Sequence, residues 1–285
     1  MADAITQGER NIESRMAAIL SAAGRILFSL GLLGLGIEHF AFGDFITGRA
    51  PAWPEGMPGR LVWAYATGGA VVVVSVMLLF RRRERQAAFV CAGLILIWAL
   101  ARHIPVLLQA PFPGGDWTRA GKAWTLIGGC LVAAAAAPTI AGLRSQMVNR
   151  LLNGRKTLIL AGRILLGCFF VLTGIQHFIF VEFVASLIPD WFPGDAVIWT
   201  YIAGVFLISG GIGLFIPRTA ALAALLSGLM VFSWIWLVHV PRTFFSVTDG
   251  IAIFEAPAVA GIAWMIAAEL FTPRAPFAGE KGSGG

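Results

Sequence analysis

The chain contains eight apolar stretches of about 20 residues each, and no other feature restricts its fold as much. An α-helix needs about 20 residues to cross a hydrocarbon core roughly 30 Å thick. With 58% hydrophobic and only 13% charged residues, the composition excludes a soluble globular domain and a disordered chain. The sequence therefore predicts an all-α integral membrane protein with eight transmembrane helices, near residues 22–42, 61–80, 86–108, 124–143, 158–180, 197–216, 219–240 and 252–271.

The segments between these stretches carry most of the basic residues and predict the topology. The side of the membrane that holds both termini would carry 15 of the 21 Lys and Arg residues, against six of the 15 acidic residues. Basic loops stay in the cytoplasm, so both termini are predicted to be cytoplasmic, as in a bacterial inner (plasma) membrane. The net charge of +6 is thus interpreted as a topology signal, and no nucleic-acid partner is predicted. The basic face could also contact anionic lipid headgroups.

The two halves of the chain repeat each other. Gly-Arg-Ile-Leu at 24–27 returns at 162–165, and Gly-Ile-Glu-His-Phe at 36–40 returns as Gly-Ile-Gln-His-Phe at 174–178, both at an offset of 138 residues. At an offset of 136, further pairs match: Trp63 with Trp199, Tyr65 with Tyr201, Gly68 with Gly204, Trp98 with Trp234, His103 with His239, and Pro105 with Pro241. Matches over this length, in two registers that differ by only two residues, indicate a duplication.

Each predicted unit contains four spans, an even number, so both units would enter the membrane in the same direction as parallel repeats. The sequence predicts two similar four-helix bundles in tandem. The boundaries are a cytoplasmic N-terminal segment 1–21, a first repeat 22–143, a basic cytoplasmic linker 144–157, a second repeat 158–271 and a flexible C-terminal tail 272–285.

The scarce polar aromatic residues occupy matching places in the two repeats. All four His and both Tyr residues fall in pairs: His39 with His177, His103 with His239, and Tyr65 with Tyr201. Helix geometry places them at a common level in the outer third of the membrane. We therefore expect a His/Tyr layer that holds a quinone or another small ligand. Glu38 is replaced by Gln176 in the second repeat, and Lys122 and Glu255 mark the fourth spans, so the layers differ in charge.

The layer has two interpretations. Ionisable groups at membrane depth are costly and usually face a bundle interior, so Glu38, His39 and His177 are candidates for proton transfer. Alternatively, these side chains bond to loop carbonyls or lipid headgroups and fix the outer helix ends. No metal site is predicted, because no local spacing of His ligands supports one.

The residues of the repeats resemble a known family. Each unit opens with Gly-Arg-Ile-Leu, carries Gly-Ile-x-His-Phe near the outer end of its first helix, then Pro-x-Trp, and has Trp-x-Tyr-x-x-Gly leading into the second helix. This pattern is similar to the DoxX-like superfamily and covers about residues 22–143 and 158–271. Some members of that superfamily resemble a membrane subunit of a thiosulfate:quinone oxidoreductase. They commonly contain one four-span unit, whereas this chain contains two, and only His39 and His177 correspond to a family motif.

The resemblance implies a quinone-associated redox subunit or accessory protein in the lipid bilayer. Because the sequence has no Cys pattern for an iron–sulfur cluster and no haem motif, a protein partner would have to supply the redox chemistry. Two alternatives remain. One is a transporter or lipid-handling protein with a path between the two halves. The other is a non-catalytic membrane scaffold that assembles other proteins.

Overall fold

The computed structural model describes residues 2–46, 50–137, 154–244 and 247–271, and within these ranges every regular element is a helix. The helices are, in chain order, α1 (Ala2–Phe42), α2 (Arg60–Leu79), α3 (Glu84–Trp98), η1 (Ala99–His103), α4 (Ile104–Gln109), α5 (Gly115–Ala136), α7 (Arg155–Ile179), α8 (Val181–Ala185), α9 (Ala196–Phe215), α10 (Ala220–Trp234), η2 (Ile235–His239), α11 (Val240–Arg242) and α12 (Val247–Phe271).

Seven helical segments of the described chain are long and apolar enough to cross a membrane. They are Asn11–Phe42, Arg60–Leu79, Glu84–Gln109, Arg155–Ile179, Ala196–Phe215, Ala220–Arg242 and Gly250–Phe271. Together with the composition, these seven segments indicate a helical integral membrane protein. An eighth long helix, α5, carries Asp116, Arg119 and Lys122 in its first turns. The predicted span at 124–143 corresponds to α5 only up to Ala136, and its last residues lie outside the described ranges.

The long helices form a ring in which the first and last helices of the chain are neighbours. Along the chain, α1 packs on α2, α2 on α3, α3 on α5, α5 on α7, α7 on α9, α9 on α10, and α10 on α12, and the ring closes where α12 packs on α1. The helices therefore do not separate into two independent bundles. The fourth long helix of each half packs on the first helix of the other half, α5 on α7 and α12 on α1.

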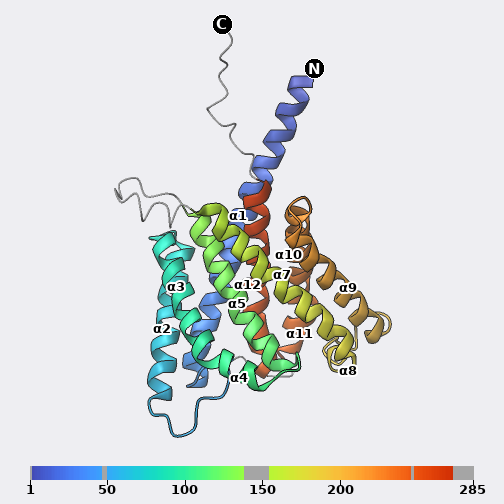
Figure 1. Ribbon diagram of the computed structural model, residues 1–285. Coiled ribbons are helices and arrows are strands. Elements are labelled where there is room, and N and C mark those ends of the chain that lie inside the picture. Colours follow the sequence, from blue (N-terminus) through green and yellow to red (C-terminus); the bar gives the residue numbers. More distant parts are fainter. Residues whose placement is uncertain (1, 47–49, 138–153, 245–246, 272–285) are drawn as a thin grey trace.

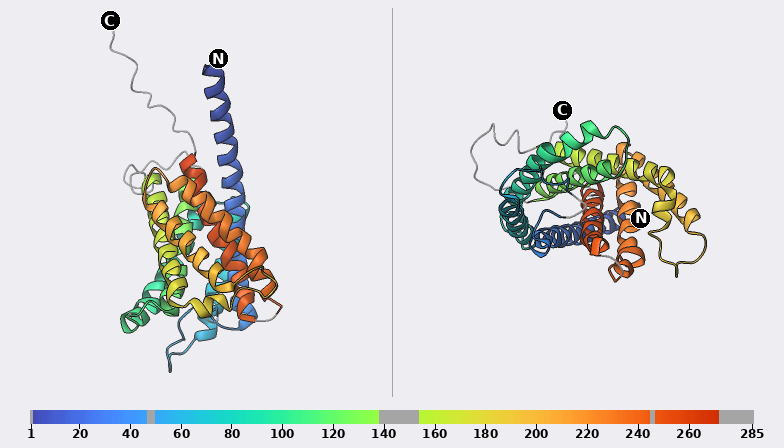
Figure 2. Two further views of the ribbon diagram at one scale, coloured as in Figure 1. Left: turned by 90° about the vertical axis from the view of Figure 1, so that its right-hand side faces the viewer. Right: turned by 90° about the horizontal axis from the view of Figure 1, so that it is seen from below.

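The two ends of the ring are easily distinguished. Figure 1 shows the turn between α2 and α3 and the end of α12 at one end, which we call the terminal end, and α4 and α8 at the opposite end, which we call the loop end. Figure 2 shows α1 extending beyond the ring at the terminal end. Seen from below, α12 lies beside α1 and α10 (Figure 2). In its apolar window 72% of the residues are buried, so α12 is the most enclosed of the seven apolar segments.

The arginine of each Gly-Arg-Ile-Leu motif caps the second helix of its half. Arg25 Nη1 donates to the carbonyl oxygens of Leu78 (3.3 Å) and Leu79 (2.8 Å) at the end of α2. Arg163 Nε donates to the Leu214 oxygen (3.0 Å) at the end of α9. The last carbonyls of a helix lack partners within the helix, and its dipole favours a cation there. The motif thus joins two helices at the terminal end.

Glycines bring the first and second helices of each half into backbone contact. A Cβ atom at Gly68 would lie 2.6 Å from the His39 Cβ and 2.9 Å from the Gly36 oxygen. In the other half, a Cβ atom at Gly204 would lie 3.0 Å from the His177 Cβ and 3.2 Å from the Gly174 oxygen. Because such approaches exclude any side chain, the two glycine pairs fix the position of His39 and His177 against α2 and α9.

The third helix of each half contains one π-helical turn, η1 or η2, which ends at His103 or His239. Each turn is followed within two residues by a proline, Pro105 or Pro241. Proline lacks the backbone N–H that would continue the ladder of helical hydrogen bonds, so a local change of winding before it is expected. The helices continue past the proline into α4 and α11 instead of ending there.

Candidate functional site

A cluster of aromatic rings covers His39 at the loop end of the first half. The Phe45 ring lies 5.8 Å from the His39 ring and 5.0 Å from the Trp98 ring, both edge to face. Trp53 stacks on the other side of Phe45 at 5.5 Å. The Trp98 Nε1 donates to Thr67 Oγ1 (3.0 Å), which fixes the indole against α2. His39 and Phe45 are both buried. The Phe45 ring therefore fills the space between His39 of α1 and Trp98 of α3.

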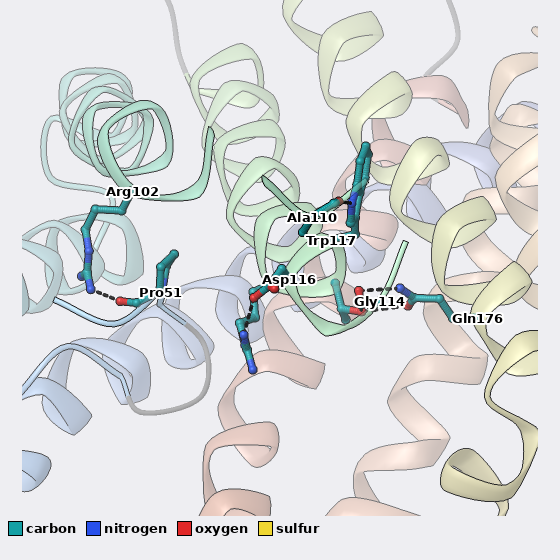
Figure 3. Close-up of polar contacts among 9 residues, drawn as sticks. Pro51, Arg102, Ala110, Gly114, Asp116, Trp117 and Gln176 are labelled. Carbon is teal, nitrogen blue, oxygen red and sulfur yellow. Dashed lines mark hydrogen bonds and ion pairs between the residues drawn. The ribbon is translucent and has the colours of Figure 1, made fainter. Parts of the chain in front are cut away.

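Arg102 holds this cluster closed. Its guanidinium lies 4.4 Å from the centre of the Phe45 ring and 5.4 Å from that of Trp53, and Nη2 donates to the Pro51 carbonyl oxygen (Figure 3). An arginine over aromatic faces is stabilised by the ring quadrupoles, the more so when it is buried, as here. Arg102, which lies in η1, therefore holds the connection between α1 and α2 against the other helices.

The second half places the corresponding side chains differently. Phe183, which matches Phe45 in the repeat, is 66% exposed, whereas Phe45 is 6% exposed. Trp191, the match of Trp53, is also exposed and packs on Phe192. The His177 ring lies 6.5 Å from the Trp234 ring, centre to centre, and within 23° of parallel. The second half thus has the same histidine and tryptophan without the cover.

The proton positions on the two histidines follow from their partners. The Nδ1 atoms of His39 and His177 lie 2.8 Å from the Leu35 oxygen and 2.7 Å from the Thr173 oxygen. A carbonyl oxygen only accepts hydrogen bonds, so each Nδ1 carries the proton and donates it. In the neutral ring, Nε2 then has a lone pair. Each Nε2 can accept a proton or a hydrogen bond from a ligand hydroxyl.

The predicted tyrosines lie on α2 and α9, the helices that pack on those of His39 and His177, but they face another way. Tyr65 stacks on Phe40 at 5.3 Å and Tyr201 on Phe178 at 5.4 Å, and both tyrosines are exposed. Their ring partners, Phe40 and Phe178, directly follow His39 and His177 in the chain. The histidines themselves point toward the glycines of the second helices. The tyrosines therefore lie on the outer surface of each helix pair, while the histidines lie on the inner side.

The predicted acidic residue Glu38 and its match Gln176 are both buried. Gln176 Nε2 donates to the carbonyl oxygens of Pro113 (2.8 Å) and Gly114 (3.0 Å), and its Oε1 accepts from Thr118 Oγ1 (2.8 Å). Figure 3 shows this amide beside the segment that leads into α5. Gln176 therefore fixes the start of α5 against α7. His103 is buried and His239 half-buried at the ends of the π turns.

Glu255 forms an ion pair with Lys122 between the two fourth helices. Lys122 Nζ lies 2.6 Å from Glu255 Oε2, and both side chains are largely removed from solvent. Glu255 is thus engaged across the interface between α5 and α12. Toward the terminal end from this pair, a Cβ atom at Gly129 would lie 2.5 Å from Ile262 Cγ1, so apolar side chains pack tightly between the same helices. In the described ranges, no group of three or more His, Cys, Asp or Glu side chains is arranged to hold a metal ion.

Sequence reasoning did not select several residues that build these clusters. Phe45, Trp98, Trp234 and Arg102 were not among the predicted site residues. Two signals could have found them. Arg102 is a charged residue within a predicted span, which alone marks a functional or structural site. Trp98 and Trp234 match in the repeat, as the histidines do.

The second half of the chain matches a known family model. A domain of unknown function (DUF8561) matches residues 166–273, which begin within α7 and include α8 to α12. This range contains His177, Trp234 and Glu255. No curated protein and no solved structure matches the chain.

Proposed function

We propose that the protein binds a quinol at the loop end of its second half and serves as a quinone-associated subunit or accessory of a membrane redox system. The contrast between the buried Phe45 and the exposed Phe183 carries the proposal. His177 and Trp234 are half-buried, whereas His39 is buried and its ring contacts Phe45, which also contacts Trp98. A flat lipophilic ring can stack on an indole, and its hydroxyl can donate to His177 Nε2.

The chemistry of this site follows from the histidine tautomer. Thr173 keeps the proton on Nδ1, so the neutral ring accepts the hydroxyl proton of a quinol at Nε2. The protonated ring then donates to a quinone carbonyl. Oxidation of the quinol to the quinone releases two protons and two electrons. His177 takes one proton, the second would leave to water at the loop end, and the two electrons would pass to a protein partner. Similarity to the DoxX-like superfamily supports the same assignment.

The proposal extends to the origin and orientation of the chain. A tandem duplication is supported by matched geometry: Arg25 and Arg163 cap the second helices, Phe40–Tyr65 and Phe178–Tyr201 stack alike, and η1 and η2 end at matching histidines. We propose eight spans in two parallel repeats, both termini in the cytoplasm and a location in a bacterial inner membrane. The charge distribution of the loops supports this orientation.

Transport is less well supported, because the interface between α5 and α12 is packed by Gly129 and Ile262 and closed by the Lys122–Glu255 pair. A polar path between the halves would need to cross this interface. No contact in the described ranges favours the scaffold role over quinol binding.

The test is saturable binding of decylubiquinol to the full chain in lipid nanodiscs, followed by quenching of tryptophan fluorescence. Loss of the hydrogen bond between the quinol hydroxyl and His177 Nε2 corresponds to roughly tenfold weaker binding. We expect this loss for His177→Ala and wild-type binding for His39→Ala, whose histidine is already covered. Phe45→Ala should create a second binding site. Equal effects of the two histidine variants, or no saturable binding, would contradict the proposal.

A further inference from the structure

An apolar groove lies between α2 and α3 at the terminal end, away from the histidine clusters. Its volume is about 450 Å³. Small residues form part of its lining, and arginine and glutamine lie at one end: the lining includes Gly69, Ala70, Val73, Ala87, Arg83 and Gln86. Val73 is exposed beside it, so the groove opens on the outer surface of the ring, which faces lipid in a membrane protein.

We propose that this groove binds one anionic phospholipid, with an acyl chain along α2 and α3 and the phosphate at Arg83. The groove runs from Gly69 to the turn that follows Leu79. Ten helical steps correspond to about 15 Å, which is half of a hydrocarbon core of roughly 30 Å. The groove therefore has the length of an acyl chain within one leaflet, with its charged end at the headgroup level.

Charge complementarity selects an anionic headgroup. The turn between α2 and α3 carries three consecutive arginines, Arg81, Arg82 and Arg83, all exposed. Arg81 Nε lies 3.4 Å from Glu84 Oε2 and is partly neutralised. Within the described ranges, Arg83 makes no ion pair, and its side chain lines the groove. An arginine near the membrane surface attracts an anionic lipid by about 1 kcal/mol.

The second half provides a natural comparison. The corresponding helices there, α9 and α10, have neither the small lining residues nor the cation. At the repeat offset, Gly69 and Ala70 correspond to Val205 and Phe206, and Arg83 corresponds to Thr219. The small lining and the cation are thus replaced by bulky apolar residues and a hydroxyl. Replacing Gly69 and Ala70 by the Val and Phe of the second half therefore tests the groove with residues that the same fold already accommodates.

The test measures binding of phosphatidylglycerol and phosphatidylcholine with identical acyl chains to the detergent-solubilised full chain by native mass spectrometry. One arginine contact corresponds to a preference of about fivefold for phosphatidylglycerol. We expect Arg83→Gln to remove this preference, and Gly69→Val with Ala70→Phe to weaken binding of both lipids. Arg218→Gln, which removes one cation from the turn between α9 and α10, is the matched control and should retain the preference.

Four results would overturn the proposal. The wild-type chain could bind both lipids equally, Arg218→Gln could act as strongly as Arg83→Gln, or the bulky pair could leave binding unchanged. A dimer that covers the groove would identify a second copy of the chain as its occupant. Helical content by circular dichroism verifies folding, and a Cβ atom at Gly69 meets Phe40 Cζ only at 3.7 Å, an ordinary contact.

Discussion

Lys122 on α5 and Glu255 on α12 form an ion pair 2.6 Å long that joins the two halves of the molecule. The neighbouring contacts show that these two positions correspond. Gly128 of α5 packs on Gly162 of α7, while Gly261 of α12 packs on Gly24 of α1, so the fourth helices use the same face in the same register. Two identical units could place only equal charges here. Opposite charges at matching positions require two halves that have diverged in sequence.

Charge reversal tests this pair. We expect Lys122→Glu to lower the thermal denaturation midpoint in detergent, because two carboxylates then meet in a largely buried place, at a cost of roughly 1–3 kcal/mol. The double variant Lys122→Glu with Glu255→Lys should restore most of the stability. Arg60→Glu, at the more exposed pair with Asp44 (3.3 Å), should have a smaller effect. A double variant no more stable than the single one would contradict a direct interaction.

The capping arginines give a second prediction. Arg163→Leu should destabilise the protein by about 1–3 kcal/mol, since it removes hydrogen bonds to the last carbonyls of α9. Arg25→Leu should do the same at α2. Hydrogen exchange should rise selectively in the last turn of the helix that loses its arginine. Arg15→Leu, an exposed change on α1, is the control, and exchange that rises evenly along the chain would argue against capping.

Glycine substitutions separate close packing from helix propensity. At Gly68 an added methyl group would lie 2.6 Å from His39 Cβ, so Gly68→Ala should cost about 1–3 kcal/mol through overpacking. At Gly93 on α3, no described atom lies within 4 Å of the added group. Gly93→Ala should therefore be neutral or stabilising by up to about 1 kcal/mol. The measurement is the midpoint of thermal denaturation, and a reversed order of the two variants would refute this packing.

Arg102 should control the connection between α1 and α2. Arg102→Met keeps a long apolar stem but removes the guanidinium, with its hydrogen bond to the Pro51 oxygen and its contact with the Phe45 ring. We expect faster hydrogen exchange in residues 50–57 and a loss of about 1–3 kcal/mol of stability. Arg242→Met is the matched control, because Arg242 donates to the Ser186 oxygen (3.1 Å) at an exposed place. Unchanged exchange in Arg102→Met would show that the aromatic rings suffice.

The helical fold was largely predictable because its cause is local. Apolar stretches of sufficient length determine helices in lipid, and seven of the predicted spans correspond to helical segments with the required length and hydropathy. Packing between helices is not local. The contact of α1 with α12 joins residues from opposite ends of the chain, whereas the sequence repeat predicted two four-helix bundles and not a ring.

The site was less predictable than the fold, for a physical reason. His39 and His177 stand in matching sequence contexts, yet one is covered and the other is not, because Phe45 folds inward and Phe183 outward. The inward Phe45 ring lies under the guanidinium of Arg102, which corresponds to Val238 in the second half. The environment of the histidine thus includes a residue from a distant helix, and no property of the histidine segment reveals it.

The contact between α1 and α12 also affects the order in which the helices can pack during translation. α1 leaves the ribosome before α12, and it exposes Gly24 and Gly31, whose packing partners, Gly261 and Ala258, are translated later. Until α12 is made, α1 lies in the bilayer without this partner. Closure of the ring is therefore a late event in biogenesis, and a ribosome stalled before α12 would hold an intermediate open to insertion factors or to a foreign helix.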